Sequence, residues 1–104
     1  MIMIKYSKKT YAAVAKADMS LLGVQLGAAC IDAEIPVQVV ARWMGVSRQG
    51  VYYWFTGVTD IEAGKRVKVE NIIATLLSAL DAEELPAKDL FTALVVVKKY
   101  RRTK

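Results

Sequence analysis

One stretch of the chain, residues 37–57, constrains the fold more than any other because it carries a strict pattern of residue types at fixed spacings. The stretch reads VQVVARWMGVSRQGVYYWFTG. Two short helices joined by a tight turn need apolar residues on their inner sides, a small residue where they pack closely and a glycine at the turn. All seven positions are filled in register, by Val40, Ala41, Met44, Gly45, Val46, Val51 and Trp54. We therefore expect one helix from Pro36 to about Met44 and a second from after Ser47 to about Phe55.

This spacing is that of a helix-turn-helix, and the stretch resembles the phage-repressor class of the motif, the lambda-repressor/Cro-like family. The likeness extends to Gly50 inside the second helix and to Phe55, Thr56 and Gly57, which close it. The close likeness covers residues 37–57, and the rest of the chain matches the family by the order of its helices. The resemblance implies an all-α fold, a compact bundle of about five helices with a central helix-turn-helix that binds DNA.

The resemblance also implies roles for individual residues. It places Ser47, Arg48, Gln49 and Tyr53 at base edges, and Tyr52 and Thr56 nearer the DNA backbone. The family often begins the motif with a glutamine that helps hold a phosphate. Here Val37 occupies that position and Gln38 follows it, so Gln38 is our candidate for a backbone contact. Three basic residues lie just before or at the start of a further helix that we expect over about residues 67–80. They are either phosphate contacts or part of a solvated connection: Lys65, Arg66 and Lys68.

Helical geometry supports these roles independently of any family. On a helix that begins after Ser47, Val51 and Trp54 point to the core. The opposite side carries no acid and holds Arg48, Gln49, Tyr52, Tyr53 and Thr56. Arginine reads guanine O6 and N7, glutamine can read adenine, and tyrosine can contact a thymine methyl or a phosphate. The alternative is a pair of helices used only for packing or for contact with a protein.

Hydrophobic periodicity predicts the remaining elements. A helix over residues 18–33, capped by Asp18 or Ser20, places on one face Leu22, Leu26, Ala29 and Cys30. A helix over about residues 67–80 places on one stripe Ile72, Ile73, Leu76, Leu77 and Leu80. A fifth helix begins near Pro86, although residues 90–100 also fit a strand because they contain the β-branched run LVVV. Residues 1–16 are ambiguous.

The C-terminal segment, residues 86–104, has more apolar surface than a domain of this size easily covers. We expect a second copy of the chain to cover it and to form a homodimer interface through Leu90, Leu94 and Val97. Each copy would then contact one half-site of the DNA, with half-sites about one helical turn, ~34–36 Å, apart.

Positive charge gathers at the two ends of the chain, whose net charge is +5 over 104 residues. Residues 1–16 form a basic segment with four lysines and no acid, and residues 90–104 hold five basic residues and no acid. Basic ends suit a polyanion, although solubility alone also explains them. A chain of this length fits one domain, which we expect to span residues 1–104.

Composition excludes several kinds of site. The chain has one cysteine and no histidine, so it lacks the usual zinc ligands and the commonest general base. No glycine-rich phosphate loop is present, and we expect no metal, no cofactor, no small-molecule substrate and no enzymatic activity. The N-terminus lacks the charge-first order of a secretory signal, and no stretch reaches the ~20 apolar residues of a membrane helix. We therefore expect a cytoplasmic protein.

Together these patterns favour a sequence-specific double-stranded DNA-binding protein that inserts the helix over residues 48–56 in the major groove as a homodimer. By resemblance, it would be a transcriptional regulator or repressor of a phage or mobile element. An alternative is a protein-interaction module, such as an antirepressor or inhibitor, that uses its apolar C-terminal segment. A third hypothesis is non-specific duplex binding through the basic ends, with a steep dependence on salt.

Overall fold

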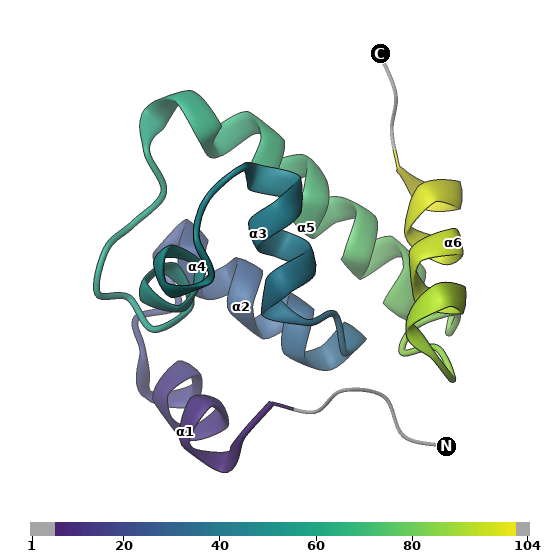
Figure 1. The fold of residues 1–104 in the computed structure, drawn as a ribbon, viewed down its shortest axis with the longest axis horizontal. Coiled ribbons are helices and arrows are strands. Elements are labelled where there is room, and N and C mark those ends of the chain that lie inside the picture. Colours follow the sequence, from purple (N-terminus) through teal and green to yellow (C-terminus); the bar gives the residue numbers. More distant parts are fainter. Residues whose placement is uncertain (1–5, 102–104) are drawn as a thin grey trace.

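Residues 6–101 are described in this computed structural model, and they contain six α-helices and one short 3-10 turn but no strand (Figure 1). In chain order these are α1 (Lys8–Lys16), α2 (Leu22–Ala33), α3 (Val37–Met44), α4 (Arg48–Phe55), η1 (Ala63–Lys65), α5 (Arg66–Asp81) and α6 (Leu90–Tyr100). None of these helices is long and apolar enough to cross a membrane. The all-α class is confirmed, with one helix more than the expected five or so. The additional helix is α1, which forms where the sequence pattern is ambiguous.

Side-chain caps mark the starts of three helices. The acceptors are Ser7 Oγ for the N–H of Thr10 (3.1 Å), Ser47 Oγ for that of Gly50 (3.0 Å) and Asp89 Oδ1 for that of Thr92 (2.8 Å). Each bond satisfies an N–H group that the first helical turn leaves without a partner. The cap predicted at Ser47 is confirmed. Helix α6 begins at Leu90 and not near Pro86, because Asp89 supplies its cap.

Helix α2 also begins later than predicted. Its first residue is Leu22, and Leu21 at the cap position has no capping side chain. Asp18 Oδ1 instead accepts hydrogen bonds from the Ser20 hydroxyl (2.7 Å) and backbone N–H (2.9 Å), which lower the pKa of the Asp18 carboxyl. Such local side-chain bonds compete with helix formation. The predicted cap at Asp18 or Ser20 is therefore wrong, because the two residues form a turn ahead of the helix.

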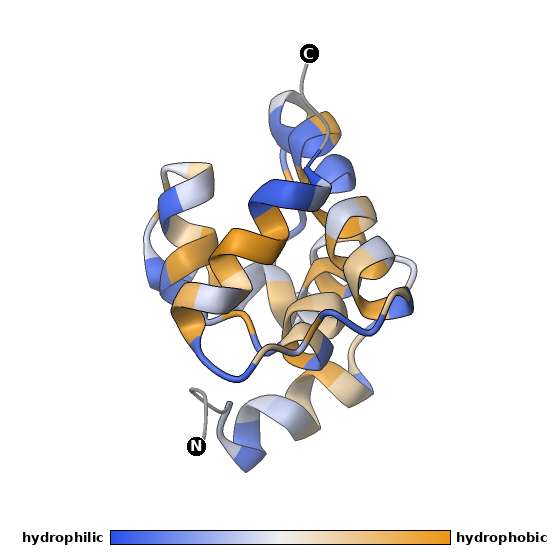
Figure 2. Ribbon diagram, turned by 90° about the vertical axis from the view of Figure 1, so that its right-hand side faces the viewer, coloured by the Kyte–Doolittle hydropathy of each residue, from blue (hydrophilic) through white to orange (hydrophobic). Residues whose placement is uncertain are grey.

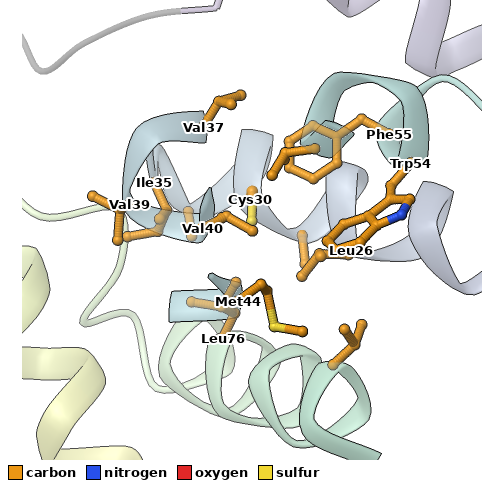
Figure 3. Close-up of a cluster of buried hydrophobic side chains, with 14 of the residues drawn as sticks. Leu26, Cys30, Ile35, Val37, Val39, Val40, Met44, Trp54, Phe55 and Leu76 are labelled. Carbon is orange, nitrogen blue, oxygen red and sulfur yellow. The ribbon is translucent and has the colours of Figure 1, made fainter. Parts of the chain in front are cut away.

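Helix α2 forms the centre of the core. It packs against α1, α4 and α5, while α3 packs on α4 and α6 packs on α5. Figure 3 shows Leu26 and Cys30 of α2 clustered with Val40, Phe55 and Leu76, which come from three other helices. The stripe predicted for this helix is confirmed, since all its members are buried: Leu22, Leu26, Ala29 and Cys30. Burial raises the pKa of the Cys30 thiol, as suits an inert core residue.

The stripe predicted for α5 is confirmed in most of its members, since Leu76 is buried and Ile72, Ile73 and Leu80 are half-buried against the core. Val69, Leu76 and Ala79 are buried and Ile72 is half-buried, whereas Leu77 is 52% exposed. Residues 69, 72, 76 and 79 recur at steps of three and four, which puts them in one line along the helix. The prediction is therefore wrong only at Leu77, and it missed Val69 and Ala79, because α2 packs against the line that starts at Val69.

Residues 90–100 form a helix, and the strand alternative is wrong. Side chains of α6 that face the core are buried or half-buried, namely Leu90, Ala93, Leu94, Val96 and Val97. Phe91 and Val95 remain 77% and 51% exposed. Figure 2 faces this side of the molecule, and the ribbon of α6 is orange over much of its length. Val97, one of the expected interface residues, thus packs in its own chain, and the apolar surface left open on α6 consists of Phe91 and Val95.

A polar clamp fixes the end of α6 to the loop that precedes it. The Tyr100 hydroxyl donates a hydrogen bond to the Glu84 carboxylate, and Lys99 Nζ donates to both Glu84 oxygens at 3.1 and 3.2 Å. The hydrogen bond from Tyr100, followed by that from Lys99, lowers the pKa of the Glu84 carboxyl. The same bond raises the pKa of Tyr100.

Candidate nucleic-acid interface

The turn between α3 and α4 has the geometry that its sequence predicts. Gly45 has a left-handed backbone with φ of 69°, and its N–H donates to the Ala41 carbonyl. The N–H of Val46 donates to the same carbonyl at 3.1 Å. Ala41 and Met44 are buried between the two helices and the core. Glycine suits position 45 because a side chain at positive φ is strained.

The inner side of α4 is held against α2 at unusually short range. Val51, Trp54 and Phe55 are buried, as predicted for the core-facing side of this helix. Two glycines of α2 permit the close approach. A methyl group at Gly23 would lie 2.7 Å from the Trp54 carbonyl oxygen, and one at Gly27 would lie 2.8 Å from Phe55 Cγ. The sequence pattern contains both glycines, but only the fold reveals what they contact.

The outer side of α4 is exposed to solvent and carries the residues expected to read bases. They are Ser47, Arg48, Gln49 and Tyr53, and they are joined on this side by Tyr52. The two tyrosines are 40% and 41% exposed. The side-chain amide of Gln49 donates to the Tyr53 hydroxyl at 2.8 Å, one turn further along the helix. Arg48 takes part in none of the ion pairs formed within residues 6–101. Because residues 37–57 contain no acid, this surface has positive charge.

A groove of about 300 Å³ runs beside this surface, where the first turns of α1 and α3 meet α4. Its lining consists of Tyr6, Ser7, Pro36, Val37, Gln38, Arg48 and Tyr52. The fold therefore brings Gln38 and Tyr52, both expected at the DNA backbone, together with Arg48. The sequence gives no signal for Tyr6 or Ser7 at this groove. The Tyr6 hydroxyl donates to the Ile35 carbonyl, and burial raises the pKa of Tyr6.

Two predicted contact residues also stabilise the ends of α4. Ser47 Oγ caps the first turn through the N–H of Gly50. The half-buried Thr56 donates its hydroxyl proton to the Tyr52 carbonyl at 2.8 Å, in the last turn. The Ser47 hydroxyl keeps its proton, so it can still donate to DNA. The Thr56 hydroxyl keeps only lone pairs and must give up its bond to Tyr52 before it can donate to a phosphate.

The three basic residues around the start of α5 are engaged with protein groups. Lys65 pairs with Glu62 at 3.0 Å, and Arg66 pairs with Asp60 at 3.4 Å. Lys68 Nζ donates to the carbonyl of Trp43, in the last turn of α3, at 2.7 Å. None of the three lines the groove that holds Gln38 and Arg48.

Asp60 is a structural residue that sequence reasoning missed. Its carboxylate accepts a hydrogen bond from the N–H of Gly23 at 3.2 Å, in the first turn of α2. The N–H of Ile61, together with Gly23 and the Arg66 guanidinium, holds the pKa of Asp60 below its usual range. Because α2 has no cap of its own, Asp60 supplies one from the loop after α4. The separation of 37 residues explains why no local pattern reveals it.

Comparison of the chain with models of protein families, with curated proteins and with solved structures gave no match. A functional proposal therefore depends on the side chains that the fold displays. On the outer side of α4 these are one guanidinium, one amide and two phenols, next to a groove that adds a second amide and a serine hydroxyl.

Proposed function

We propose that this protein binds double-stranded DNA in a sequence-specific manner, with α4 in the major groove, and that it regulates transcription. The observation that carries this proposal is the division of α4 into two sides. One side is buried against α2 and α3, and the other displays Arg48, Gln49, Tyr52 and Tyr53 on a helix pair without acids. Repression from a phage or mobile-element operator is the form that the resemblance favours.

The outer side of α4 suits base recognition. The major groove is about 12 Å wide and admits one α-helix, whose N-terminal residues come nearest the base edges. Arg48 and Gln49 are the first two residues of α4. Arginine can donate two hydrogen bonds to guanine, and glutamine can pair with adenine through its amide oxygen and nitrogen. In the free protein the Gln49 amide nitrogen is bonded to Tyr53, so we propose that reading adenine exchanges this bond for one to the base.

The neighbouring groove suits a phosphate of the DNA backbone. Gln38 can donate its amide protons and Tyr52 its hydroxyl proton, and the guanidinium of Arg48 adds positive charge. These groups come from the first turn of α3 and from α4, so they would fix the angle at which α4 enters the major groove. Such contacts carry no sequence information but make the affinity depend on salt.

We further propose that two copies bind together. The apolar surface of Phe91 and Val95 lies on α6, on the opposite side of the molecule from α4 in Figure 1. A second copy that covers this surface would leave both α4 helices free for DNA. Leu90 and Leu94, half-buried on the same helix, would border the contact.

Amide NMR spectra, recorded while a duplex of mixed sequence is added, test which surface meets DNA. We expect shifts to concentrate on residues 38 and 47–56. A matched pair of variants removes one exposed positive charge each, Arg48→Ala on α4 and Lys98→Ala on α6. We expect Arg48→Ala to weaken binding several-fold more than Lys98→Ala does, since exposed charges away from the duplex are screened. Equal losses, or shifts confined to the chain ends, would support non-specific binding instead.

A protein-interaction module is the second candidate, and the exposure of Phe91 favours it. An aromatic side chain that is 77% exposed is a common anchor in protein contacts. This alternative predicts that Arg48→Ala and Gln49→Ala leave function intact, while Phe91→Ser abolishes it. If the protein is a DNA regulator, Arg48→Ala and Gln49→Ala weaken the binding of one protomer to DNA, while Phe91→Ser leaves that binding intact.

A further inference from the structure

A second pocket, of about 270 Å³, lies between the C-terminal end of α3 and helices α5 and α6. Its lining consists of Trp43, Lys68, Asn71, Ile72, Thr75, Val97 and Arg101. No residue of α4 contributes to it, and of the residues expected at DNA only Lys68 lines it. A ligand in this pocket would therefore not displace one that contacts α4.

The lining combines an apolar wall with positive charge. Trp43, Ile72 and Val97 supply the apolar surface. The Thr75 hydroxyl donates its proton to the Asn71 carbonyl at 2.9 Å, so its polar capacity is largely satisfied. The charged residues of the lining are Lys68 and Arg101, and no carboxylate lines the pocket within the described chain. An apolar pocket with two cations and no acid complements an apolar molecule that carries one negative charge.

Lys68 is held in place at this pocket. Its ammonium group donates to the Trp43 carbonyl at 2.7 Å. That carbonyl belongs to the last turn of α3, where carbonyls lack helical partners and attract positive charge. An ammonium group has three protons, so two remain for another acceptor while this bond is kept. A ligand can therefore pair with Lys68 without breaking the contact between α3 and α5.

We propose that this pocket binds a small apolar carboxylate. Its hydrocarbon part lies against Trp43, Ile72 and Val97, and its carboxylate accepts hydrogen bonds from Lys68 and Arg101. The volume is just below the range of about 300–1,000 Å³ typical of ligand sites, which suits a short acyl chain or a single ring. Because the pocket lies between the end of α3 and helices α5 and α6, a bound ligand would hold α3 in place and so stabilise the pair formed by α3 and α4.

Octanoate is the probe, and octanol is its matched neutral control. Binding is followed by the emission of Trp43, compared with a Trp43→Phe protein, and by amide NMR spectra. We expect saturable binding of octanoate with shifts at residues 68–75, 97 and 101. We expect octanol to bind several-fold more weakly, since it cannot pair with Lys68 and Arg101, which are both exposed, so water weakens each ion pair. Equal affinity of the two probes, or shifts centred on Phe91 and Val95, would overturn the proposal.

Three variants separate the charge of the pocket from its packing. Lys68→Met and Arg101→Gln each remove one lining charge, and Lys98→Met removes an exposed charge outside the lining. We expect the first two each to weaken octanoate binding a few-fold, toward the octanol value, and the third to leave it unchanged. If the Lys68→Met protein does not fold because it loses its bond to Trp43, the octanoate affinity of Arg101→Gln alone tests the proposal. Full octanoate affinity in Arg101→Gln and in a folded Lys68→Met would refute the carboxylate site.

Discussion

At the scale of single residues, two glycines of α2 determine how near α4 lies to the core. Gly23 and Gly27 are spaced four apart, on one face of α2, and the backbone and Cβ atoms of Trp54 and Phe55 occupy the space that side chains would need. Helix α2 gives up the better helix propensity of alanine at both positions. Because both positions are glycine, α4 can bury Trp54 and Phe55 in the core while its polar side stays in solvent.

Gly27→Ala tests this close approach. The added methyl group would lie 2.8 Å from Phe55 Cγ and 2.9 Å from its Cβ, so α4 must move. We expect the variant to lose about 1–2 kcal/mol of unfolding free energy, because overpacking outweighs the gain of about 0.5–1 kcal/mol in helix propensity. Urea denaturation measures the change. Gly64→Ala is the control, since no atom lies within 4 Å of its added methyl group, and we expect it to stay within about 0.5 kcal/mol. A Gly27→Ala protein as stable as the wild type would contradict the close approach.

At the scale of elements, α6 depends on a contact with the loop between it and α5. Glu84 in that loop is bonded to Tyr100 and Lys99, which end the helix. Apolar contacts of Ala93, Val96 and Val97 hold the middle of α6 against α5, and the clamp fixes its end. The position of α6, and therefore of the exposed Phe91 and Val95, depends on the Glu84 carboxylate, which can be protonated in acid.

Stability should fall in acid partly because of Glu84. Its pKa in the folded protein lies below its ordinary 4.5, so the stabilisation is present above pH 4.5 and is lost as the pH falls through the lowered pKa. We expect Glu84→Gln to be less stable than the wild type at neutral pH, and its stability to fall less steeply in acid. Thermal unfolding between about pH 6 and about pH 3 measures both slopes. The remaining slope of the variant is expected from other carboxyls with lowered pKa, namely Asp18, Asp60 and Asp89. Parallel curves for wild type and Glu84→Gln would refute the clamp.

At the scale of the whole molecule, the fold separates two surfaces. Helices α4 and α6 lie at opposite edges in Figure 1, with α2 and α5 between them. Helix α4 exposes polar side chains, and α6 exposes Phe91 and Val95. Such a separation allows a protein to pair with its own copy and still present a second surface to another partner. A pair that contacts one inverted repeat must hold both copies of α4 on the same side, about 34–36 Å apart.

Phe91→Ser tests the pairing. We expect the wild type to sediment as a dimer at high micromolar concentration, and the variant to dimerise at least about tenfold more weakly, since a symmetric contact loses the aromatic ring twice. Folding should be unaffected because Phe91 is 77% exposed. Val58→Ser is the control, an exposed apolar residue after α4 that we expect to leave the dimer intact. A wild-type monomer at these concentrations would contradict the pairing.

Local chemistry explains what the sequence could predict. The turn at Gly45, the cap at Ser47 and the inner positions Val51 and Trp54 all depend on residues within one or two helical turns. Their spacing therefore indicates α3, α4 and the outer side of α4 directly. The same holds for the buried face of α2, where Leu22 and Leu26 repeat at helical steps.

Long-range contacts explain what the sequence could not predict. The apolar residues of α5 cover a wide face of the helix, and only the position of α2 buries Val69 and leaves Leu77 exposed. The cap of α2 comes from Asp60 in a distant loop, and the groove beside α4 includes Tyr6 from a stretch without clear periodicity. Each depends on a partner far along the chain, which no window of sequence contains.

The central claim is that the outer side of α4 reads base sequence, and selection from random duplex DNA at near-physiological salt tests it most directly. We expect the wild type to enrich an inverted repeat. We expect Arg48→Ala to lose or relax the preference at one base pair of each half-site, where a lost bidentate contact costs about 1–3 kcal/mol of discrimination. Lys98→Ala should enrich the same repeat as the wild type. No enrichment by the wild type, with binding that fades as salt rises, or an identical repeat from Arg48→Ala, would contradict the claim.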